Sequence, residues 1–469
     1  MNYSVKRGPA RRWLEVSALA SLLTSIPGCY NERSTSEPPF EASLDVQLRE
    51  SLQRWGSVLP IAEIPVQNAA LVDLGRALFF DKTLSGNRDV SCATCHDLAS
   101  HTTDGMSLAV GTGGIGTGAA RVPGPGQQFV PRNAPSLLNQ ALMFPYVFWD
   151  GRLAEFNRAT DSSLGVKFPP GLSGVIATQA MLPVLNRTEM RGQRGDRDRF
   201  GNLNELADLS DNAATEIWAA AMRRLLSIND YVAKFNAAFA GTPTAQLGFQ
   251  HAANAIAVFE LNAFSKTGSL FDRFLKGESR AMSDEAKRGG LLFFRKALCA
   301  QCHNGPLLGG QQFANIGVPQ LGPGVGKAAP LDRGRGELFA TPPNVIGPYQ
   351  FAFRVPPLRN VELTAPYMHN GAYPTLEAVV RHYSNADSAL RNYDVSQLAS
   401  SLRGSYHGDA VTIAAIAQTM DFRVRQVIRL TPLEQLQLVE FLKSLTDPSA
   451  HDLSAIAPTS VPSGLPVRE

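Results

Sequence analysis

We expect a mainly α-helical protein built from two similar halves, because of three features of the sequence. Apolar residues recur at helical spacing over residues 215–239 and 242–264, and long alternating strand patterns are absent. The pattern Gly-x-x-Leu-Phe-Phe occurs twice, at residues 75–80 and 289–294. The length of 469 residues suffices for two or three domains, with an ordinary globular composition of 44% hydrophobic and 18% charged residues. A net charge of +3 gives no indication of nucleic-acid binding.

A Cys-x-x-Cys-His motif follows each copy of the repeat, at residues 92–96 and 299–303. Two thiols at this spacing can form thioethers with one porphyrin, and the adjacent His can bind its iron. A zinc ribbon would bring the two Cys pairs within about 15–20 residues of each other, and a redox dithiol needs no His. We therefore predict two covalently bound c-type haems in duplicated cytochrome c-like domains that pack around a shared interface. The predicted ligands and attachment sites are Cys92, Cys95 and His96 for one haem, and Cys299, Cys302 and His303 for the other.

The N-terminus predicts export. A basic start is followed by a short apolar run over residues 16–26, which is typical of a secretory signal peptide over residues 1–28 and is too short to span a membrane. Gly28 before Cys29, the fifth cysteine, is typical of a lipoprotein cleavage site, so that a lipidated Cys29 would anchor the protein to a membrane. A plain signal peptide is the alternative. Both interpretations place the protein in the periplasm, because haem c is attached outside the cytoplasm.

The rest of the chain divides by composition and motif position. We expect a polar tether over residues 29–60, because this stretch is rich in Ser, Glu and Pro. An N-terminal haem domain over 61–265 and a C-terminal haem domain over 266–450 follow. The Pro- and Ser-rich residues 451–469 are expected to be a disordered tail.

Four further stretches resemble one known family. These are Pro-Arg-Asn-Ala-Pro-Ser-Leu-Leu-Asn at 131–139, Phe-Trp-Asp-Gly-Arg at 148–152, Glu189-Met190, and the segment 355–371, which ends Tyr-Met-His-Asn-Gly. Together with the haem motifs they are similar, in order and over roughly residues 65–445, to the di-haem cytochrome c peroxidase family, which includes MauG.

The resemblance implies roles for individual residues. His96 would be the proximal ligand of an N-terminal, peroxidatic haem, and Glu189 the acid and base beside it. Trp149 would relay electrons between the haems, and His303 would bind the C-terminal, electron-transfer haem. Without the family, Glu189 would be taken as a surface carboxylate and Trp149 as a core residue.

A calcium site is also implied by the resemblance. Asn133, Thr364 and the carbonyl of Pro366 match the family's inter-domain Ca2+ ligands, and neutral oxygens with waters suit this hard cation.

One departure from the family concerns the N-terminal haem. Typical members carry a His, in the loop before the Pro-Arg-Asn motif, that caps the resting iron. Here no His lies between His101 and Pro131, and His101 is too close to His96 to reach the opposite face. We therefore expect a five-coordinate haem at rest that reacts with peroxide without prior reduction.

The second departure concerns the C-terminal haem. Typical members place a Met fourteen residues after the His of the Tyr-x-His-x-Gly motif, but Tyr383 stands there in this chain, as in MauG. A phenolate is a hard anion that stabilises ferric and ferryl iron, so Tyr383 ligation would let this haem store an oxidising equivalent. The alternatives are that Tyr383 only packs and that His382 or Met420 is the ligand.

Three functions are compatible with the sequence. The first is a peroxidase that reduces hydrogen peroxide with electrons from a small cytochrome c or cupredoxin, passed from the C-terminal to the N-terminal haem. The second is a MauG-type enzyme whose high-valent di-haem state oxidises residues of a partner protein. The third is a simple di-haem electron carrier, which Glu189 and the missing distal His disfavour.

Overall fold

Helices make up most of the regular structure. The computed structural model describes residues 42–142, 145–156, 159–162, 165–339 and 347–468. Its α-helices within these residues are α1 (Leu44–Trp55), α2 (Ala69–Phe80), α3 (Cys92–Cys95), α4 (Val175–Ala180), α5 (Glu205–Asp208), α6 (Ala214–Leu226), α7 (Asn229–Ala238), α8 (Phe249–Phe264), α9 (Leu270–Leu275), α10 (Asp284–Leu291), α11 (Leu376–Ser384), α12 (Ala386–Arg391), α13 (Ala410–Thr419) and α14 (Pro432–Lys443). The expected, mainly α-helical fold is confirmed.

The strands are short and antiparallel. They are β1 (Gly114–Ile115) with β2 (Val122–Pro123), the three-stranded sheet of β3 (Tyr146–Val147), β4 (Leu153–Phe156) and β5 (Ala159–Ser162), and β6 (Phe313–Ala314) with β7 (Phe353–Arg354). They hold loops in place between helices and contribute no large sheet within the described residues.

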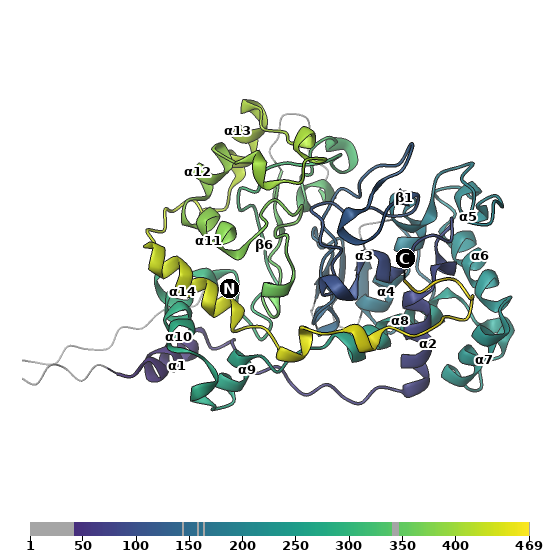
Figure 1. Ribbon diagram of the computed structural model, residues 1–469, viewed down its shortest axis with the longest axis horizontal. Helices are drawn as coiled ribbons and strands as arrows, with labels where there is room; N and C mark the ends of the chain where they lie inside the picture. Colours follow the sequence, from purple (N-terminus) through teal and green to yellow (C-terminus); the bar gives the residue numbers. More distant parts are fainter. Residues whose placement is uncertain (1–41, 143–144, 157–158, 163–164, 340–346, 469) are drawn as a thin grey trace, which may run out of the picture. The chain divides into compact units, whose positions relative to one another are not determined.

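Helix α2 lies against α8 (Figure 1), and the two helices are closest at Gly75. A Cβ at Gly75 would lie 2.0 Å from the Ala255 carbonyl oxygen, so a larger residue would force the helices apart. One turn further along α2, the Phe79 ring packs against Phe259 and Phe264, with centroids 5.3 and 5.5 Å away. These side chains belong to the hydrophobic core beside the first haem motif.

Helix α10 crosses α14 in the same manner. A Cβ at Gly289 would lie 1.8 Å from the Gln437 carbonyl oxygen. Phe293, in the π-helical turn that continues α10, packs against Phe441 with centroids 5.0 Å apart. The sequence repeat is therefore a structural repeat, since in both copies the Gly permits a close helix crossing and the first Phe fills the core behind it.

The first described helix differs from the expected tether. Residues 44–55 form α1, which begins at Ser43, whose side chain accepts a hydrogen bond from the Val46 amide, and ends at Gly56 in the left-handed conformation. Leu48 and Leu52 are buried in the core that contains α10 and α14. These two core positions were not predicted from the sequence, because residues 29–60 are polar in overall composition.

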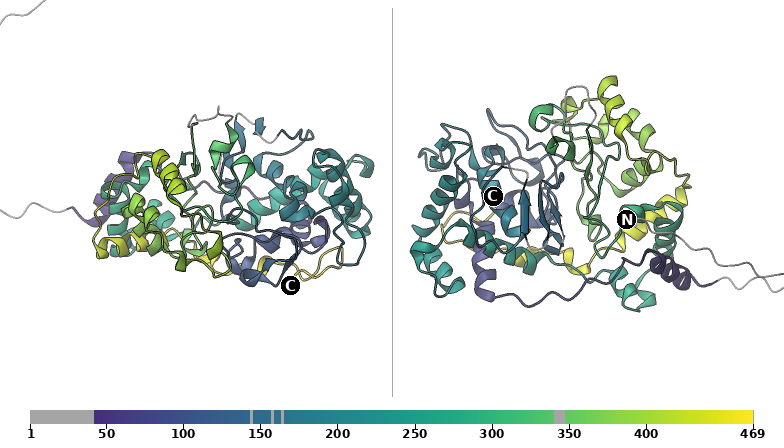
Figure 2. Two further views of the ribbon diagram at one scale, coloured as in Figure 1. Left: turned by 90° about the horizontal axis from the view of Figure 1, so that it is seen from above. Right: turned by 180° about the vertical axis from the view of Figure 1, so that it is seen from behind.

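The C-terminal residues differ from the expected disordered tail. The yellow chain leaves α14 and runs away from α1 toward α8 and α2 (Figures 1 and 2). Val461 is buried in the core around α2 and α8. Ser463 Oγ donates to Asp81 Oδ1 at 2.6 Å, and Tyr231 donates to the other oxygen of Asp81 at 2.8 Å. The composition predicted disorder because it does not reveal this distant partner.

The predicted signal peptide over residues 1–28 and the predicted anchor at Cys29 lie outside the described residues. Among the helices that the structure does describe, none has the length and apolar character needed to cross a membrane.

Candidate functional site

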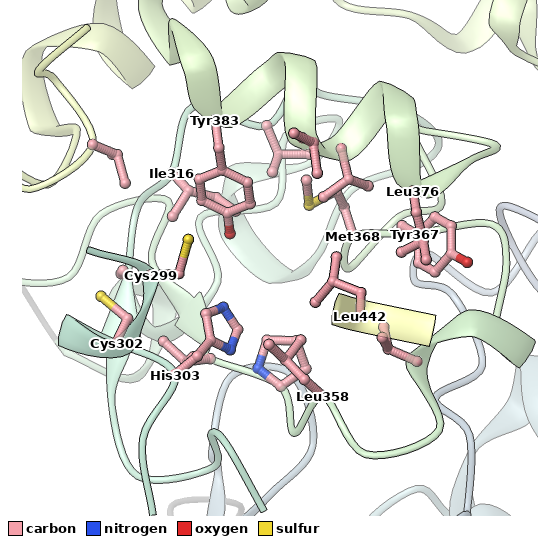
Figure 3. Close-up of a pocket in the computed structure, with 18 of the residues that line it drawn as sticks. Cys299, Cys302, His303, Ile316, Leu358, Tyr367, Met368, Leu376, Tyr383 and Leu442 are labelled. Carbon is pink, nitrogen blue, oxygen red and sulfur yellow. The ribbon is translucent and has the colours of Figure 1, made fainter. Parts of the chain in front are cut away.

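The second Cys-x-x-Cys-His motif lines a cavity of about 600 Å³. Cys299, Cys302 and His303 lie on one wall, and α11 supplies the facing wall, as Figure 3 shows. Apolar side chains fill most of the remaining lining, among them Ile316, Val318, Phe353, Leu358, Leu376, Val380, Leu438 and Leu442. This size and apolar character suit a cofactor the size of a porphyrin.

The imidazole of His303 is oriented by the loop after the motif. Its Nδ1 lies 3.1 Å from the Leu308 carbonyl oxygen, which can only accept, so Nδ1 carries the proton and Nε2 presents a lone pair. Burial lowers the pKa of His303 to about 4, which keeps the ring neutral. A neutral imidazole with a fixed tautomer is the form that binds iron.

Tyr383 points from α11 into the cavity toward His303 (Figure 3). Burial raises the pKa of its phenol well above the usual range, and Cys302 and Cys299 contribute to this shift, which shows that the ring lies near the attachment cysteines. A metal ion beside the phenol would oppose this shift, because its charge favours the phenolate.

The two alternative ligands are placed elsewhere. His382 uses both ring nitrogens, one with the Ile316 carbonyl at 2.7 Å and the other with the Tyr373 hydroxyl at 2.8 Å. Met420 is buried in a separate apolar cluster and does not line the cavity. Of the three candidates, only Tyr383 faces the cavity.

Met368 also lines this cavity (Figure 3) and was missed in the sequence. It lies two residues after Pro366 with a left-handed backbone (φ 78°). Its position inside the Tyr-Met-His-Asn-Gly stretch was the available signal, because a thioether is a common haem ligand.

The first motif repeats the arrangement of the second. Cys92 and Cys95 begin and end the short helix α3, and His96 follows. The Nδ1 of His96 lies 3.0 Å from the Thr102 carbonyl oxygen, so the same tautomer is fixed. Burial lowers the pKa of His96 as well. All four cysteines are free of disulfides and available for thioethers.

Glu189 lies near this first motif. The loop over residues 110–112 connects them, since the Thr112 amide donates to the Glu189 carbonyl at 2.9 Å and Cys95 Sγ contacts the Val110 carbonyl at 4.0 Å. A π-helical turn over Arg187–Arg191 carries Glu189, and π-turns are frequent at functional sites. Burial raises the pKa of the Glu189 carboxyl, while the charge of Arg152 opposes this.

The Glu189 carboxylate is held by one neighbour. Asn186 Nδ2 donates to Glu189 Oε1 at 2.7 Å, and Asn186 Oδ1 caps the same turn by accepting from the Thr188 and Glu189 amides at 3.0 and 3.3 Å. Asn186 thus fixes both the backbone and the side chain of Glu189.

Trp149 and the three predicted calcium ligands line the cavity of the second motif. Trp149 Nε1 donates to the Asn133 carbonyl at 2.9 Å, which fixes the indole. The Asn133 amide group donates to the Met106 carbonyl at 2.7 Å, and the Thr364 hydroxyl donates to the Val361 carbonyl at 3.0 Å. Among the described residues, no cluster of three His, Cys, Asp or Glu side chains offers a metal site, so a cation here would rely on neutral oxygens.

A buried ionic group beside Trp149 was not foreseen. Arg132 donates to Asp150 at 2.6 Å and to both oxygens of Asp332 at 2.6 and 2.9 Å, and all three residues are buried. Burial disfavours the charged form of each of these groups. The attraction between them outweighs burial, so the two carboxylates raise the pKa of Arg132, and Arg132 lowers the pKa of Asp150 and of Asp332. The group joins chain segments 200 residues apart, a contact with no local sequence signal.

The residues present fit haem c. Each motif offers two free thiols and a neutral imidazole whose Nε2 is unprotonated, and the second motif opens into an apolar cavity of suitable volume. His96 would bind one iron and His303 the other, with Tyr383 facing the second.

Comparison with known proteins agrees with this chemistry. The family model described as di-haem cytochrome c peroxidase matches residues 69–280, and a RoxA-like, cytochrome c-like model matches residues 352–386. MauG, the methylamine utilization protein of Methylorubrum extorquens, is 33% identical over 312 residues, 66% of this chain and 68% of that protein. Cytochrome c551 peroxidase of Pseudomonas aeruginosa is 32% identical over 316 residues, 67% and 71% of the two chains.

Solved structures show a similar fold. A MauG-like protein associated with microbial copper homeostasis aligns with a TM-score of 0.56 at 24% identity, over 85% of this chain and 96% of that one. The diheme peroxidase BthA from Burkholderia thailandensis aligns with a TM-score of 0.56 at 20% identity, over 86% and 92%. On the sequence relationships, this chain belongs to the di-haem cytochrome c peroxidase family.

Proposed function

We propose that this protein is an exported di-haem peroxidase that reduces hydrogen peroxide to water. The observation that carries the proposal is the contrast between two alike haem motifs: a partly buried carboxyl group, Glu189, lies near the first, while Tyr383 faces the second. Haem c bound at the first motif would supply the iron that receives peroxide. The overall reaction consumes one peroxide, two electrons and two protons, and it yields two waters.

Glu189 is the proton-handling residue in this proposal. Its raised pKa lets the carboxyl take a proton from the near oxygen of peroxide and return it to the leaving oxygen. Asn186 holds Oε1 by its hydrogen bond, which leaves the other carboxyl oxygen for the substrate. Both steps occur beside the first motif.

Trp149 and Tyr383 serve electron delivery from the C-terminal to the N-terminal haem. Tyr383, which faces His303 across the cavity, would bind the iron of the C-terminal haem. Trp149 lies on the wall of the same cavity with its indole fixed by Asn133. We assign it the relay toward the first motif.

The remaining assignments complete the proposal. Asn133, Thr364 and the Pro366 carbonyl bind one Ca2+ with the help of waters. The two haem domains extend over residues 61–265 and 266–450 and pack around a shared interface at Arg132 and Asp332. The mature protein is periplasmic, either free after removal of residues 1–28 or anchored through Cys29.

A second function is favoured by two observations, the cavity-facing Tyr383 and the absence of any His between His101 and Pro131. A hard anionic ligand stabilises oxidised iron, which suits a MauG-type enzyme that withdraws electrons from aromatic side chains of a partner protein. Peroxide would still be the oxidant, and two electrons would come from the partner's residues.

Steady-state turnover separates the two functions. The haem-loaded protein is mixed with peroxide and a reduced small cytochrome c or cupredoxin, and donor oxidation is followed optically. We expect two donors oxidised per peroxide in many cycles. Peroxide-driven bleaching of the haems without donor oxidation would contradict the peroxidase and favour the second function, whereas no reaction with peroxide at all would contradict both.

A further inference from the structure

The cavity of the second motif opens to solvent between two segments, residues 296–298 and 422–429. Three apolar side chains at this opening are exposed: Leu298 at 43%, Phe422 at 73% and Val427 at 57%. Soluble proteins seldom expose large apolar side chains beside one another unless a partner covers them. We call these three residues the apolar rim.

Cations surround the apolar rim. Lys296, Arg423 and Arg429 line the opening, and Arg425 is exposed between them in sequence. Two of these charges are compensated, because Lys296 pairs with Glu434 at 2.6 Å and Arg423 pairs with Asp421 at 2.7 Å. The excess positive charge therefore comes from Arg429, which lines the opening, and from Arg425, which is exposed four residues earlier in the chain.

The cations next to the rim are held in place. Arg425 donates to the Met420 and Gln418 carbonyls at 2.8 and 2.6 Å, and Arg423 donates to Gln312 at 2.7 Å. These bonds hold the guanidinium groups of Arg425 and Arg423 in place without a partner. Fixed charges cost less entropy on binding than mobile ones.

The opening also lies next to the haem attachment. The charge of Arg423 acts on the Cys302 thiol, and Leu298 directly precedes Cys299. A partner seated on the rim would thus lie close to the edge of a haem held by these cysteines.

We infer that the partner of this site is an acidic redox protein whose carboxylates surround an apolar centre. The inference rests on the proposed function, in which a donor supplies electrons to the C-terminal haem. Arg425 and Arg429 would attract the acidic ring, while Leu298, Phe422 and Val427 would bury the apolar centre. Each docked donor gives up one electron, so two donors are oxidised for each peroxide reduced.

The test uses the haem-loaded full chain and two probes, a strongly acidic cupredoxin and a strongly basic cytochrome c. The second-order rate of electron transfer from each reduced probe is measured at low and high ionic strength. We compare the wild type with R425E/R429E and with the control R199E/R223E, whose exposed arginines lie outside the cavity lining. Haem content and absorption spectra confirm that each variant is folded.

For the acidic probe we expect a rate that falls about tenfold between low and high salt, and about tenfold in R425E/R429E at low salt. The control should stay within about twofold of the wild type, because equal charge changes away from the opening do not act on docking. Phe422→Ser should lower the rate at every salt concentration. Equal effects of the two double variants, or faster transfer from the basic probe, would overturn the inference.

Peroxide turnover with ascorbate and a small redox mediator separates this result from a failure of the proposed function. If the enzyme turns over peroxide with the mediator but the rate of electron transfer from the two protein probes does not depend on charge, only the inference of an acidic partner is refuted. No turnover with the mediator in the wild type would refute the peroxidase itself.

Discussion

At both haem motifs, the imidazole Nδ1 donates to a carbonyl of the following loop, Thr102 in one and Leu308 in the other, at 3.0 and 3.1 Å. The helices behind the motifs also match, since Gly75 and Gly289 permit the same close crossing. The differences lie elsewhere: Glu189 lies near the first motif and Tyr383 faces the second. The duplicated scaffold thus keeps the parts that would hold a haem and differs in the side chains to which the proposed function assigns its reaction.

The largest effect is expected for Glu189→Gln. If Glu189 moves the proton during peroxide cleavage, the amide should lower kcat for peroxide by roughly 10²- to 10⁴-fold while both haem spectra stay unchanged. Peroxide turnover with a reduced donor measures this. The exposed Glu216→Gln in α6 is the matched control. If E189Q turns over peroxide as fast as the wild type, Glu189 is not the residue that makes the first motif chemically different from the second.

The pH dependence tests the same residue in the wild type. Burial raises the pKa of Glu189 above its usual 4.5, so the ionised form needed as a base is lost on acidification at a higher pH than for an ordinary Glu. We expect kcat/KM for peroxide to fall as the pH drops through this raised pKa, and we expect this fall to be absent in E189Q. If kcat/KM of E189Q still falls at the same pH, another group causes the fall.

Sequence predicted the parts of this arrangement that are local. The haem motifs, the repeat and the helices over residues 214–226, 229–238 and 249–264 follow from spacing and periodicity. The family stretches indicated Glu189, Trp149 and Tyr383. The structure places these near the motifs, but their roles remain predictions.

Contacts between distant segments could not be predicted. Arg132 meets Asp332 across 200 residues, and nothing in either segment specifies the other. The ends of the chain are a similar case, because α1 and the tail were assigned from polar and Pro-rich composition, while Leu48 and Val461 find apolar partners far along the chain. The composition of a segment indicates how polar the segment is on average. Whether one of its residues is buried depends on the distant segment that packs against it.

Arg132→Met tests whether the ionic group holds the two motif regions together. The variant leaves Asp150 and Asp332 buried without their cation, and breaking such a group costs about 3–5 kcal/mol of unfolding free energy. Denaturant unfolding followed by circular dichroism measures the loss. The neighbouring Arg333 is exposed, so Arg333→Met should change stability by less than about 0.5 kcal/mol. Equal stability of the two variants would contradict the proposed role.

Tyr383→Phe tests the second motif. Removing the hydroxyl should change the absorption and EPR spectra of the C-terminal haem and raise its reduction potential, because the iron loses an anionic ligand. The N-terminal haem should keep its spectrum. Met368→Leu, in the same cavity, is the control and should leave the spectra unchanged. The opposite outcome, with only M368L altering the spectra, would make Met368 the ligand.

The smallest effect is expected where the two ends of the chain pack against the two halves of the molecule. The core of the second motif is completed by α1, whereas the core of the first is completed by the tail through Val461 and the bond from Ser463 to Asp81. Ser463→Ala removes the bond to Asp81 and the bond that Ser463 Oγ accepts from the Leu465 amide, so it should lower the unfolding free energy by about 1–2 kcal/mol. Ser460→Ala, at an exposed position three residues earlier, should have no measurable effect. Thermal unfolding is followed at each haem separately. Because Asp81 directly follows α2, S463A should lower the midpoint at the N-terminal haem more than the midpoint at the C-terminal haem. An equal shift at both haems would mean that the two halves unfold as one unit.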